Sequence, residues 1–354
     1  MKIKKLNRKV AVGILGATGV VGQKLISLLQ GHPWFEVKEL VASPRSVDFK
    51  YQDLVNWRES QSLPLKIGNL RLKKGGDNLK SKLLFSCLDS TVADSLEKHY
   101  ADQGHFVISN ASNHRLVESV PLVVPEINAD HFGLLRKSSG RSGGLIVTNP
   151  NCVVAILAMS LSPIFKNFGL KNIIVNTMQS ASGAGYPGVS AMDLLGNVLP
   201  YIGGEEEKIS EELPKIFGKL TQTKIELAKF KTSVTCYRVP VYQGHLMTVA
   251  FTTSKRASIA QLKQSFEEFK SVNLPSSPSK TIKYFEDDDR PQPLLDVSLG
   301  GGMTVAVGRL RQCEVLGWKM VVLGNNLVRG AAGGAILNAE YLLANNLISS
   351  SFVG

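Results

Sequence analysis

Cysteine is scarce in this chain, with 4 in 354 residues. The four cysteines, Cys87, Cys152, Cys236 and Cys313, show no C-x-x-C spacing, which is typical of zinc sites and of redox-active pairs. They are also too few and too scattered for a disulfide framework, so we expect a reducing, cytoplasmic setting. No metal ion is expected.

Long hydrophobic runs are also missing. No segment approaches the roughly 18 continuous apolar residues that a membrane-spanning helix requires. The basic stretch KIKKLNRK precedes the apolar VAVGILGATGVVG, as in a signal peptide, but no A-x-A-like cleavage site follows and the run continues into the amphipathic QKLISLLQ. We therefore expect a soluble, unprocessed protein.

Negatively charged residues are in the minority: the chain has 29 Asp and Glu but 41 Lys and Arg, for a formal net charge of +12. This balance is compatible with nucleic-acid binding, yet the basic residues are spread along the chain and no DNA- or RNA-binding module stands out. A positive field also attracts small anionic substrates. We expect no nucleic acid and no membrane among the partners.

The hydrophobic pattern predicts two domains that meet near residue 150. Before it, short apolar strands alternate with helices, as in a parallel sheet covered by helices. After it, longer segments alternate polar and apolar residues, as in strands with one exposed face. The polar stretch 273–293 is predicted to be a surface excursion. Expected strands are 10–15, 37–42, 83–86, 106–109, 122–124, 145–148, 171–179, 245–253 and 303–311, and expected helices are 20–30, 92–103 and 330–346.

A glycine-rich loop lies between the first strand and the first helix. GILGATGVVG contains Gly13, Gly16, Gly19 and Gly22, a G-x-x-G-x-x-G variant. Glycines permit the tight turn and allow backbone N–H groups to approach a pyrophosphate at the helix start. The alternative is a glycine-rich turn without a ligand, and the position in the first βα unit favours a dinucleotide.

The end of the second strand favours NADP over NAD. No acidic residue, which would suit a ribose 2′-hydroxyl, follows directly; Ser43, Arg45 and Ser46 do. Hydroxyl groups and a guanidinium suit a 2′-phosphate instead. The alternative is a solvated turn.

Cys152 lies in TNPNCVVAILAMSL, directly before an apolar helical run. A sulfur at a helix start is close to unpaired backbone N–H groups and to the positive end of the helix dipole, and both favour a thiolate. The sequence thus predicts a nucleophile in a cleft between the domains. The alternative is a small buried hydrophobic residue.

Arg238 and His245 lie close together in CYRVPVYQGHLMTVAFTT, on either side of Gly244. An imidazole near a thiol can take and return protons, and a guanidinium can bind a carboxylate at two points. A structural or exposed histidine remains the alternative.

Five stretches of the chain, taken in order, resemble aspartate-β-semialdehyde dehydrogenase, in the form found in archaea and fungi. They are GATGVVG, NPNC, QSASGAGYPGVSAMD, PYIGGEEEK and RVPVYQGH. The resemblance continues through RPQPLLD, GRLR and NNLVRGAAGG, and so covers the chain nearly end to end.

The resemblance implies reversible, NADPH-dependent reduction of aspartyl-4-phosphate to aspartate semialdehyde and phosphate, on the pathway to lysine and diaminopimelate, threonine and methionine. Cys152 matches the nucleophile that forms a thioester, and His245 matches the acid/base. Gln179 matches the glutamine that positions the acyl group. A homodimer or homotetramer is expected.

The resemblance also implies which residues bind the substrate and the cofactor. Arg238 matches the group that binds the α-carboxylate, and Glu205 matches the partner of the substrate ammonium. Lys208, Arg115 and the neighbouring Asn113 match the phosphate site. The implied NADP contacts are Gly16, Ala17, Thr18, Gly19, Val20, Gly22, Ser43, Arg45, Ser46, Cys87, Ser182, Gly183 and Asn326.

The expected fold is α/β, with a Rossmann-type NADP-binding domain at 1–151 and an α+β catalytic and dimerisation domain at 152–325. A C-terminal helix, at about 326–354, is expected to return to the first domain. The chain departs from the family pattern at Val153 and Val154, where Ser or Thr is expected, and at Asn325, where Asp is common.

Three other functions compete with this one. N-acetyl-γ-glutamyl-phosphate reductase shares the fold and the Cys/His chemistry, but its substrate nitrogen is uncharged, so a carboxylate such as Glu205 facing it would be costly. In glyceraldehyde-phosphate-type enzymes the Cys and His lie much closer in sequence than 152 and 245 do. The third is a non-catalytic NADP-binding protein. The joint presence of four residues with catalytic or substrate-binding chemistry argues against it: Cys152, Gln179, Arg238 and His245.

Overall fold

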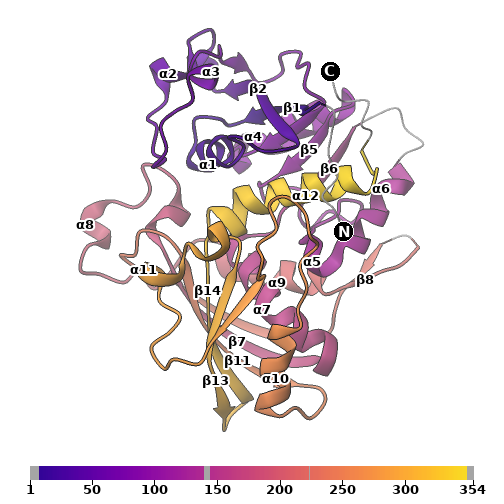
Figure 1. Ribbon diagram of the computed structural model, residues 1–354, viewed down its shortest axis with the longest axis vertical. Helices are drawn as coiled ribbons and strands as arrows, with labels where there is room; N and C mark the ends of the chain where they lie inside the picture. Colours follow the sequence, from indigo (N-terminus) through magenta and orange to yellow (C-terminus); the bar gives the residue numbers. More distant parts are fainter. Residues whose placement is uncertain (1–7, 139–143, 223, 349–354) are drawn as a thin grey trace.

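Two six-stranded sheets organise the computed structural model, which describes residues 8–138, 144–222 and 224–348. The two lobes that contain these sheets lie one above the other in Figure 1. Parts of the predicted domain ranges, namely 1–7, 139–143 and 349–354, lie outside the described residues.

The first sheet is entirely parallel and has the order β3-β2-β1-β4-β5-β6. This doubly wound order leaves a crevice for a ligand beside the first strand, at the carboxyl ends of the strands. The strands are β1 Val10–Leu15, β2 Phe35–Ala42, β3 Lys73–Lys74, β4 Leu83–Ser86, β5 Phe106–Ser109 and β6 Leu145–Thr148. The helices are α1 Val20–Leu28, α2 Tyr51–Leu54, α3 Leu65–Gly68, α4 Ser90–Asp102, α5 Pro125–Asn128 and α6 Gly133–Ser138.

The second sheet is mixed and has the order β10-β7-β11-β14-β13-β12. Helix α7 packs on one face and shares a core with β7, β11, β13 and β14. On the other face, alternate residues of β7 such as Ile174 stay exposed, which explains the alternating sequence pattern. The strands are β7 Leu170–Gln179, β10 Lys231–Arg238, β11 His245–Thr253, β12 Ile282–Phe285, β13 Val305–Cys313 and β14 Gly317–Gly324, and a small hairpin adds β8 Lys219–Leu220 and β9 Ile225–Glu226. The helices are α7 Cys152–Phe168, α8 Ala191–Leu194, α9 Glu205–Ile216, α10 Ile259–Glu267 and α11 Pro293–Asp296.

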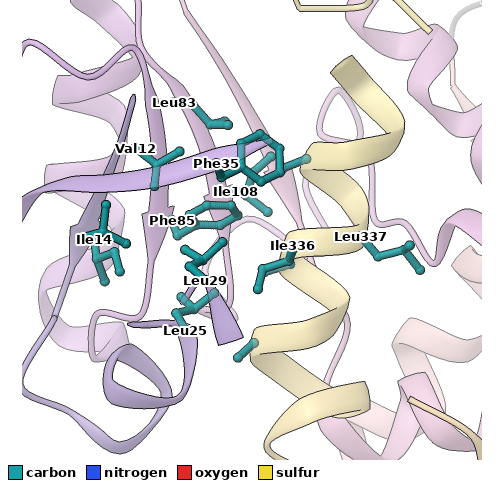
Figure 2. Packing of buried hydrophobic residues seen from close by; sticks show 14 of the residues in the cluster. Val12, Ile14, Leu25, Leu29, Phe35, Leu83, Phe85, Ile108, Ile336 and Leu337 are labelled. Atoms are coloured by element: carbon teal, nitrogen blue, oxygen red, sulfur yellow. The ribbon is translucent and has the colours of Figure 1, made fainter. Parts of the chain in front are cut away.

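The C-terminal helix α12, Gly333–Ala344, returns to the first lobe, as predicted. A π-helical turn, Val328–Ala332, leads into it. Figure 2 shows Ile336 pointing from α12 toward the apolar side chains of the first sheet, including Phe85. The first core is therefore completed by residues from the far end of the chain.

Two predictions about elements are wrong. Residues 122–124 form no strand, because Leu122 makes only one bridge to Thr148 before Pro125 opens α5. The stretch 273–293 is more than a surface excursion, since it contains β12, in which Ile282 is 2% exposed. Unlike the other four-residue strands, IKYF has a lysine between its apolar residues and forms no continuous apolar run, so only its pairing with β13 defines it. The other predicted strands and helices are present with ends shifted by at most three residues, except that the C-terminal helix, expected at about 326–354, is regular, among the described residues, only over Gly333–Ala344.

None of the helices among the described residues is both long and apolar enough to cross a membrane.

A buried ion pair fixes the π-helical turn to the first lobe. The side chains of Arg329 and Glu126 are 1% and 0% exposed, and an Arg329 η nitrogen lies 2.7 Å from Glu126 Oε1. Removing one partner from such a pair leaves an unpaired buried charge, which costs roughly 3–5 kcal/mol.

We expect Glu126→Gln to lower the thermal midpoint by roughly 5 °C or more, because Arg329 would keep its charge without its partner. Asp94→Asn is the control, since the Asp94–Lys98 pair lies on the surface with side chains 52% and 57% exposed. Its midpoint should stay within about 1 °C of the parent. Equal shifts in the two variants would contradict this account.

Candidate active site

A cleft of about 450 Å³ is lined by residues of both lobes. Its lining includes residues from the start of α1, the loop after β5, the starts of α7 and α9, the end of β7 and the segment before α12. Among the predicted site residues, its lining contains Val20, Arg115, Cys152, Gln179, Ser182, Gly183, Glu205, Lys208, Arg238 and Asn326.

Cys152 is the first residue of α7, as the sequence predicts. The preceding residue Asn151 caps the helix, because its Oδ1 accepts hydrogen bonds from the N–H groups of Val153 and Val154 at 2.8 and 3.4 Å. On its other side the cysteine meets the C-terminal segment: a Cβ atom on Gly330 would lie 2.6 Å from the Cys152 Cβ. Only glycine allows this close approach.

The two valines that depart from the family pattern do not line the cleft. Val153 and Val154 are both 0% exposed and belong to the core beneath the second sheet. Their backbone N–H groups still receive the Asn151 cap, so the helix start is kept whatever their side chains are.

His245, the first residue of β11, completes a pair with the thiol. Its Nε2 lies 3.3 Å from the Cys152 sulfur, and the residue is fully buried. The backbone N–H of Ser180 donates to Nδ1 at 3.2 Å, so in the neutral ring the proton belongs on Nε2, facing the sulfur. The Ser180 hydroxyl, 3.3 Å from Nδ1, also donates to Asn326 Oδ1 at 3.2 Å.

Burial dominates the protonation of this pair. Together with the nearby Glu205 carboxylate, it raises the pKa of the Cys152 thiol to about 12. Burial and the Arg238 guanidinium lower the pKa of His245 to about 3. The prediction that the helix start makes this thiol anionic is therefore wrong for the ligand-free protein. The Val153 N–H and the charges of Arg115 and Arg238 lower the thiol pKa, but burial outweighs them.

The Glu205 carboxylate accepts hydrogen bonds from three side chains of the cleft lining. Lys208, one turn along α9, donates to its carboxylate at 3.3 Å, and Gln179 donates at 3.3 Å. The Asn151 side chain lies 3.0 and 2.9 Å from the two carboxylate oxygens. Glu205 and Lys208 thus form an ion pair three residues apart on α9, and both line the cleft together with Gln179.

Arg238, at the end of β10, lies against the loop that follows β7. One of its η nitrogens donates to the Ser180 carbonyl at 2.8 Å. A Cβ atom on Gly183 would lie 2.8 Å from the same guanidinium and 2.9 Å from the His245 ring. A glycine at 183 is therefore what lets this loop close over both side chains.

Arg115 belongs to the cleft lining, but its predicted neighbour Asn113 does not. The Asn113 amide donates to the Ser90 carbonyl at 2.9 Å, and Asn113 is not part of the lining, whereas Asn110 is. Arg115 donates to Glu212 at 2.9 Å and to the Asn110 carbonyl at 2.6 Å. Its Nε has no hydrogen-bond partner within the described residues.

The glycine loop fits a dinucleotide. A Cβ atom on Gly22 would lie 2.4 Å from the Gly16 carbonyl oxygen, so the loop folds tightly onto the first turn of α1. No side chain caps this helix and its first turn carries no acidic residue, so its amino end is left to an anion. The N–H groups of Gly16 and Ala17 are not available, because both donate to the Val41 carbonyl.

The expected 2′-phosphate residues lie in an exposed turn after β2. The hydroxyl groups of Ser43 and Ser46 are 3.2 Å apart, and Arg45 between them is exposed. Cys87 follows β4, directly beside Gly16, whose Cβ would lie 2.6 Å from the Cys87 carbonyl oxygen. Burial raises the pKa of the Cys87 thiol. Of the predicted cofactor residues, only Val20, Ser182, Gly183 and Asn326 line the cleft itself.

Asn326 joins the cofactor side of the cleft to the catalytic side. Its side chain donates to Ser182 at 2.9 Å and accepts from the Gly244 N–H at 3.0 Å. The neighbouring Asn325 has a structural part: its Oδ1 accepts from the Val328 N–H at 2.9 Å, and its Nδ2 donates to the Val297 carbonyl at 3.2 Å. An aspartate at 325 has no donor for that carbonyl.

Sequence reasoning missed several residues that hold the site together. They are Asn110, Asn151, Ser180, Glu212 and Lys215. For two of them a signal exists, since Glu212 and Lys215 continue the spacing of Glu205 and Lys208 along one side of α9. For the others the signal is only their position beside a predicted site residue.

Two family models match the chain. The semialdehyde dehydrogenase NAD binding domain matches residues 11–134, and the semialdehyde dehydrogenase dimerisation domain matches residues 161–329. The aspartate-semialdehyde dehydrogenase of Archaeoglobus fulgidus is 44% identical over 96% of this chain and 99% of its own length. That of Saccharomyces cerevisiae is 39% identical over 96% and 99%.

Solved structures give the same result. The aspartate semialdehyde dehydrogenase of Candida albicans, solved with NADP, superposes with a TM-score of 0.89 at 37% identity, over 96% of this chain and 100% of its own. The Vibrio cholerae enzyme II, complexed with ASA, superposes with a TM-score of 0.76 at 26% identity, over 96% and 99%.

The raised pKa predicts how Cys152 reacts with iodoacetamide in the ligand-free protein. Because the thiolate is the reactive form, alkylation should be slow at pH 7 and should accelerate about tenfold per pH unit, with no plateau near the usual cysteine pKa. Peptide mapping by mass spectrometry follows this residue separately from the other cysteines.

Glu205→Gln should speed this alkylation at least about threefold at fixed pH, because the substitution removes a charge that raises the thiol pKa. Glu207→Gln, an exposed position on the same helix, is the matched control and should leave the rate unchanged. A rate that levels off below pH 9 would contradict the raised pKa.

Proposed function

The chain belongs to the aspartate-semialdehyde dehydrogenase family, and from this premise we propose that its cleft catalyses the reversible reduction of aspartyl-4-phosphate with NADPH. The products are aspartate 4-semialdehyde and phosphate, in the pathway to lysine and diaminopimelate, threonine and methionine. The observation that carries the proposal is the contact of 3.3 Å between the Cys152 sulfur and His245 inside a cleft lined by charges of both signs.

Cys152 is the proposed nucleophile. Its thiolate attacks the acyl carbon, the bond from that carbon to the phosphate oxygen breaks, and phosphate leaves with the bonding electrons, which yields a thioester. NADPH, when bound, supplies the hydride that reduces the thioester carbon. The resulting alkoxide collapses, the carbon–sulfur bond breaks, and the aldehyde leaves while the thiolate is restored.

His245 is the proposed partner of both the sulfur and the reacting oxygen. With Nδ1 occupied by the Ser180 N–H, the Nε2 proton is directed at the sulfur, where it favours the thiolate. The same N–H can donate to the oxyanion that forms on the acyl carbon. The geometry of the ring supports a role as hydrogen-bond donor, and the acid/base role implied by the resemblance stays a prediction.

We propose that the substrate itself activates the thiol. Glu205 lines the cleft beside Gln179 and raises the thiol pKa. A substrate ammonium bound to Glu205 neutralises this charge and so lowers the thiol pKa, and the thiol proton is released to solvent through the cleft before the thiolate attacks. An N-acetylated substrate has no such charge, which argues against N-acetyl-γ-glutamyl phosphate.

The remaining polar groups of the cleft are the proposed binding partners of the other charged groups of the substrate. We assign the α-carboxylate to Arg238, which is held against the Ser180 carbonyl, and the phosphate to Arg115 and Lys208. Gln179 positions the acyl group. Asn113 is proposed only as a support of the phosphate loop, because its amide is bonded to the Ser90 carbonyl.

The cofactor residues fit NADP, with the pyrophosphate at the start of α1 and the nicotinamide beside Ser182, Gly183 and Asn326. Ser43, Arg45 and Ser46 are the proposed contacts of the 2′-phosphate. We also propose that the enzyme works in the cytoplasm, where its free cysteines stay reduced.

Loss of the sulfur should abolish turnover. In the oxidative direction, with aspartate semialdehyde, phosphate and NADP, Cys152→Ala should lower kcat by about 1,000-fold or more, because no thioester forms. Absorbance of NADPH at 340 nm measures the rate. Substantial phosphate-dependent turnover by this variant would refute the covalent scheme.

The same assay separates the competing functions. The parent protein should use NADP better than NAD and should not use N-acetylglutamate semialdehyde. Comparable rates on the N-acetylated aldehyde would make the reductase the better assignment, and no turnover of either aldehyde would favour a non-catalytic NADP-binding protein.

The second lobe matches a dimerisation domain, and we propose a homodimer formed through the open face of its sheet, with a homotetramer as the alternative assembly. Apolar residues support this surface, since Ile174 on β7 is 41% exposed. Besides NADP, the other partners proposed are the small-molecule substrates aspartyl-4-phosphate, aspartate semialdehyde and phosphate.

A charge on this face should weaken the dimer. We expect the parent protein to be a dimer by light scattering after gel filtration, and Ile174→Asp to raise the dissociation constant at least about tenfold, because a buried charge would lack a partner. Leu65→Asp, at a residue of the first lobe that is 79% exposed, is the control and should stay dimeric. A monomeric parent would refute the proposal.

A further inference from the structure

Helix α9 carries four charged residues along one side, Glu205, Lys208, Glu212 and Lys215, with spacings of three, four and three residues. The first two line the cleft. Glu212 and Lys215 do not, and they are only 1% and 4% exposed. Charged groups are costly to bury, so this second pair calls for an explanation in its contacts.

The carboxylate of Glu212 joins two parts of the active site. Its Oε1 lies 2.9 Å from an η nitrogen of Arg115, which is on the loop after β5. Its Oε2 accepts the backbone N–H of Asn151 at 2.6 Å. Asn151 is the residue that caps α7 and precedes the nucleophile. One side chain therefore determines the spacing between the guanidinium and the start of the catalytic helix.

Lys215, one turn further along α9, holds the same loop by its backbone. Its Nζ donates to the carbonyl oxygens of Arg115, Val117 and Val120 at 2.7, 2.8 and 2.9 Å. These three bonds use all three protons of the ammonium group. The loop that carries Arg115 is thus attached to α9 both by its side chain and by its main chain.

This arrangement leaves the Nε edge of the Arg115 guanidinium without a hydrogen-bond partner among the described residues. One η nitrogen of Arg115 donates to Glu212, and the other donates to the Asn110 carbonyl. The Nε has no partner within the described residues, although it is buried and the residue lines the cleft. An unsatisfied buried N–H beside a proposed phosphate site is a donor that awaits an anion.

We propose that Glu212 is a positioning residue for the phosphate step, and that Lys215 supports it. Glu212 orients Arg115 so that its free edge faces the phosphate group while the same carboxylate holds the helix cap beside Cys152. This inference rests on the proposed function, because it names the phosphate as the anion that Arg115 receives. It adds a residue outside the cleft lining to the machinery of the reaction.

Glu212→Gln tests the proposal, because an amide presents a donor where one of the two carboxylate bonds requires an acceptor. In the oxidative direction, KM for phosphate should rise at least about tenfold, the scale of a lost charged hydrogen bond, while KM for aspartate semialdehyde stays within about twofold. A rise of both constants together, or of neither, overturns the proposal.

Two further variants separate positioning from general stability. Glu340→Gln removes another buried carboxylate, one that pairs with His32 outside the cleft, and should leave the two constants in the parent ratio. In an Arg115→Ala background, Glu212→Gln should no longer change KM for phosphate, since its effect passes through Arg115. Additive effects of the two substitutions would count against the inference.

A binding measurement keeps the inference distinct from the proposed function. Inorganic phosphate should protect Cys152 from iodoacetamide, and Glu212→Gln should raise the half-protecting concentration at least about tenfold. Protection without turnover in the parent would refute the function alone. Unchanged protection in the variant would refute the role of Glu212 alone. If Glu212→Gln does not fold, Lys215→Met decides: weaker protection supports the proposal, and unchanged protection overturns it.

Discussion

The hydrogen bonds between helix α9 and Asn151 are the constraint on which the active site depends. Glu205 accepts from the side chain of Asn151, and Glu212 accepts from its backbone N–H. Asn151 in turn caps α7, so the position of the Cys152 sulfur follows from these two carboxylates. Because Glu212 also holds Arg115, the nucleophile and the anion site are set relative to each other by one helix.

Burial shifts the pKa values of the two central groups of this site in opposite directions. Low solvent access raises the pKa of the Cys152 thiol and lowers that of His245, so neither group carries its charge in the free protein. The charges that favour a thiolate, Arg115 and Arg238, are present but outweighed. In the proposed function, a substrate ammonium at Glu205 would shift this balance toward the thiolate.

The end of the chain links the two lobes at the same place. The segment before α12 packs Gly330 against Cys152, and α12 itself completes the core of the first lobe. Asn326, in that segment, bonds to the loops that carry Ser182 and Gly244. The cofactor surface and the catalytic surface therefore share one backbone segment, whose glycines allow the close contacts.

The sequence alone predicted the fold class and the residues Cys152 and His245 at the centre of the site, because the signals for them are local. A glycine loop between strand and helix, a cysteine after Asn-Pro-Asn and a histidine after Gly244 need only their neighbours in the chain to be interpreted. Only the tertiary structure decided the direction of the Cys152 pKa shift, the presence of Asn110 rather than Asn113 in the cleft lining, the strand β12 and the contacts of Glu212 with Arg115 and Asn151. Each of these depends on desolvation or on contact between residues far apart in the chain, and neither is present until the two lobes close around the cleft.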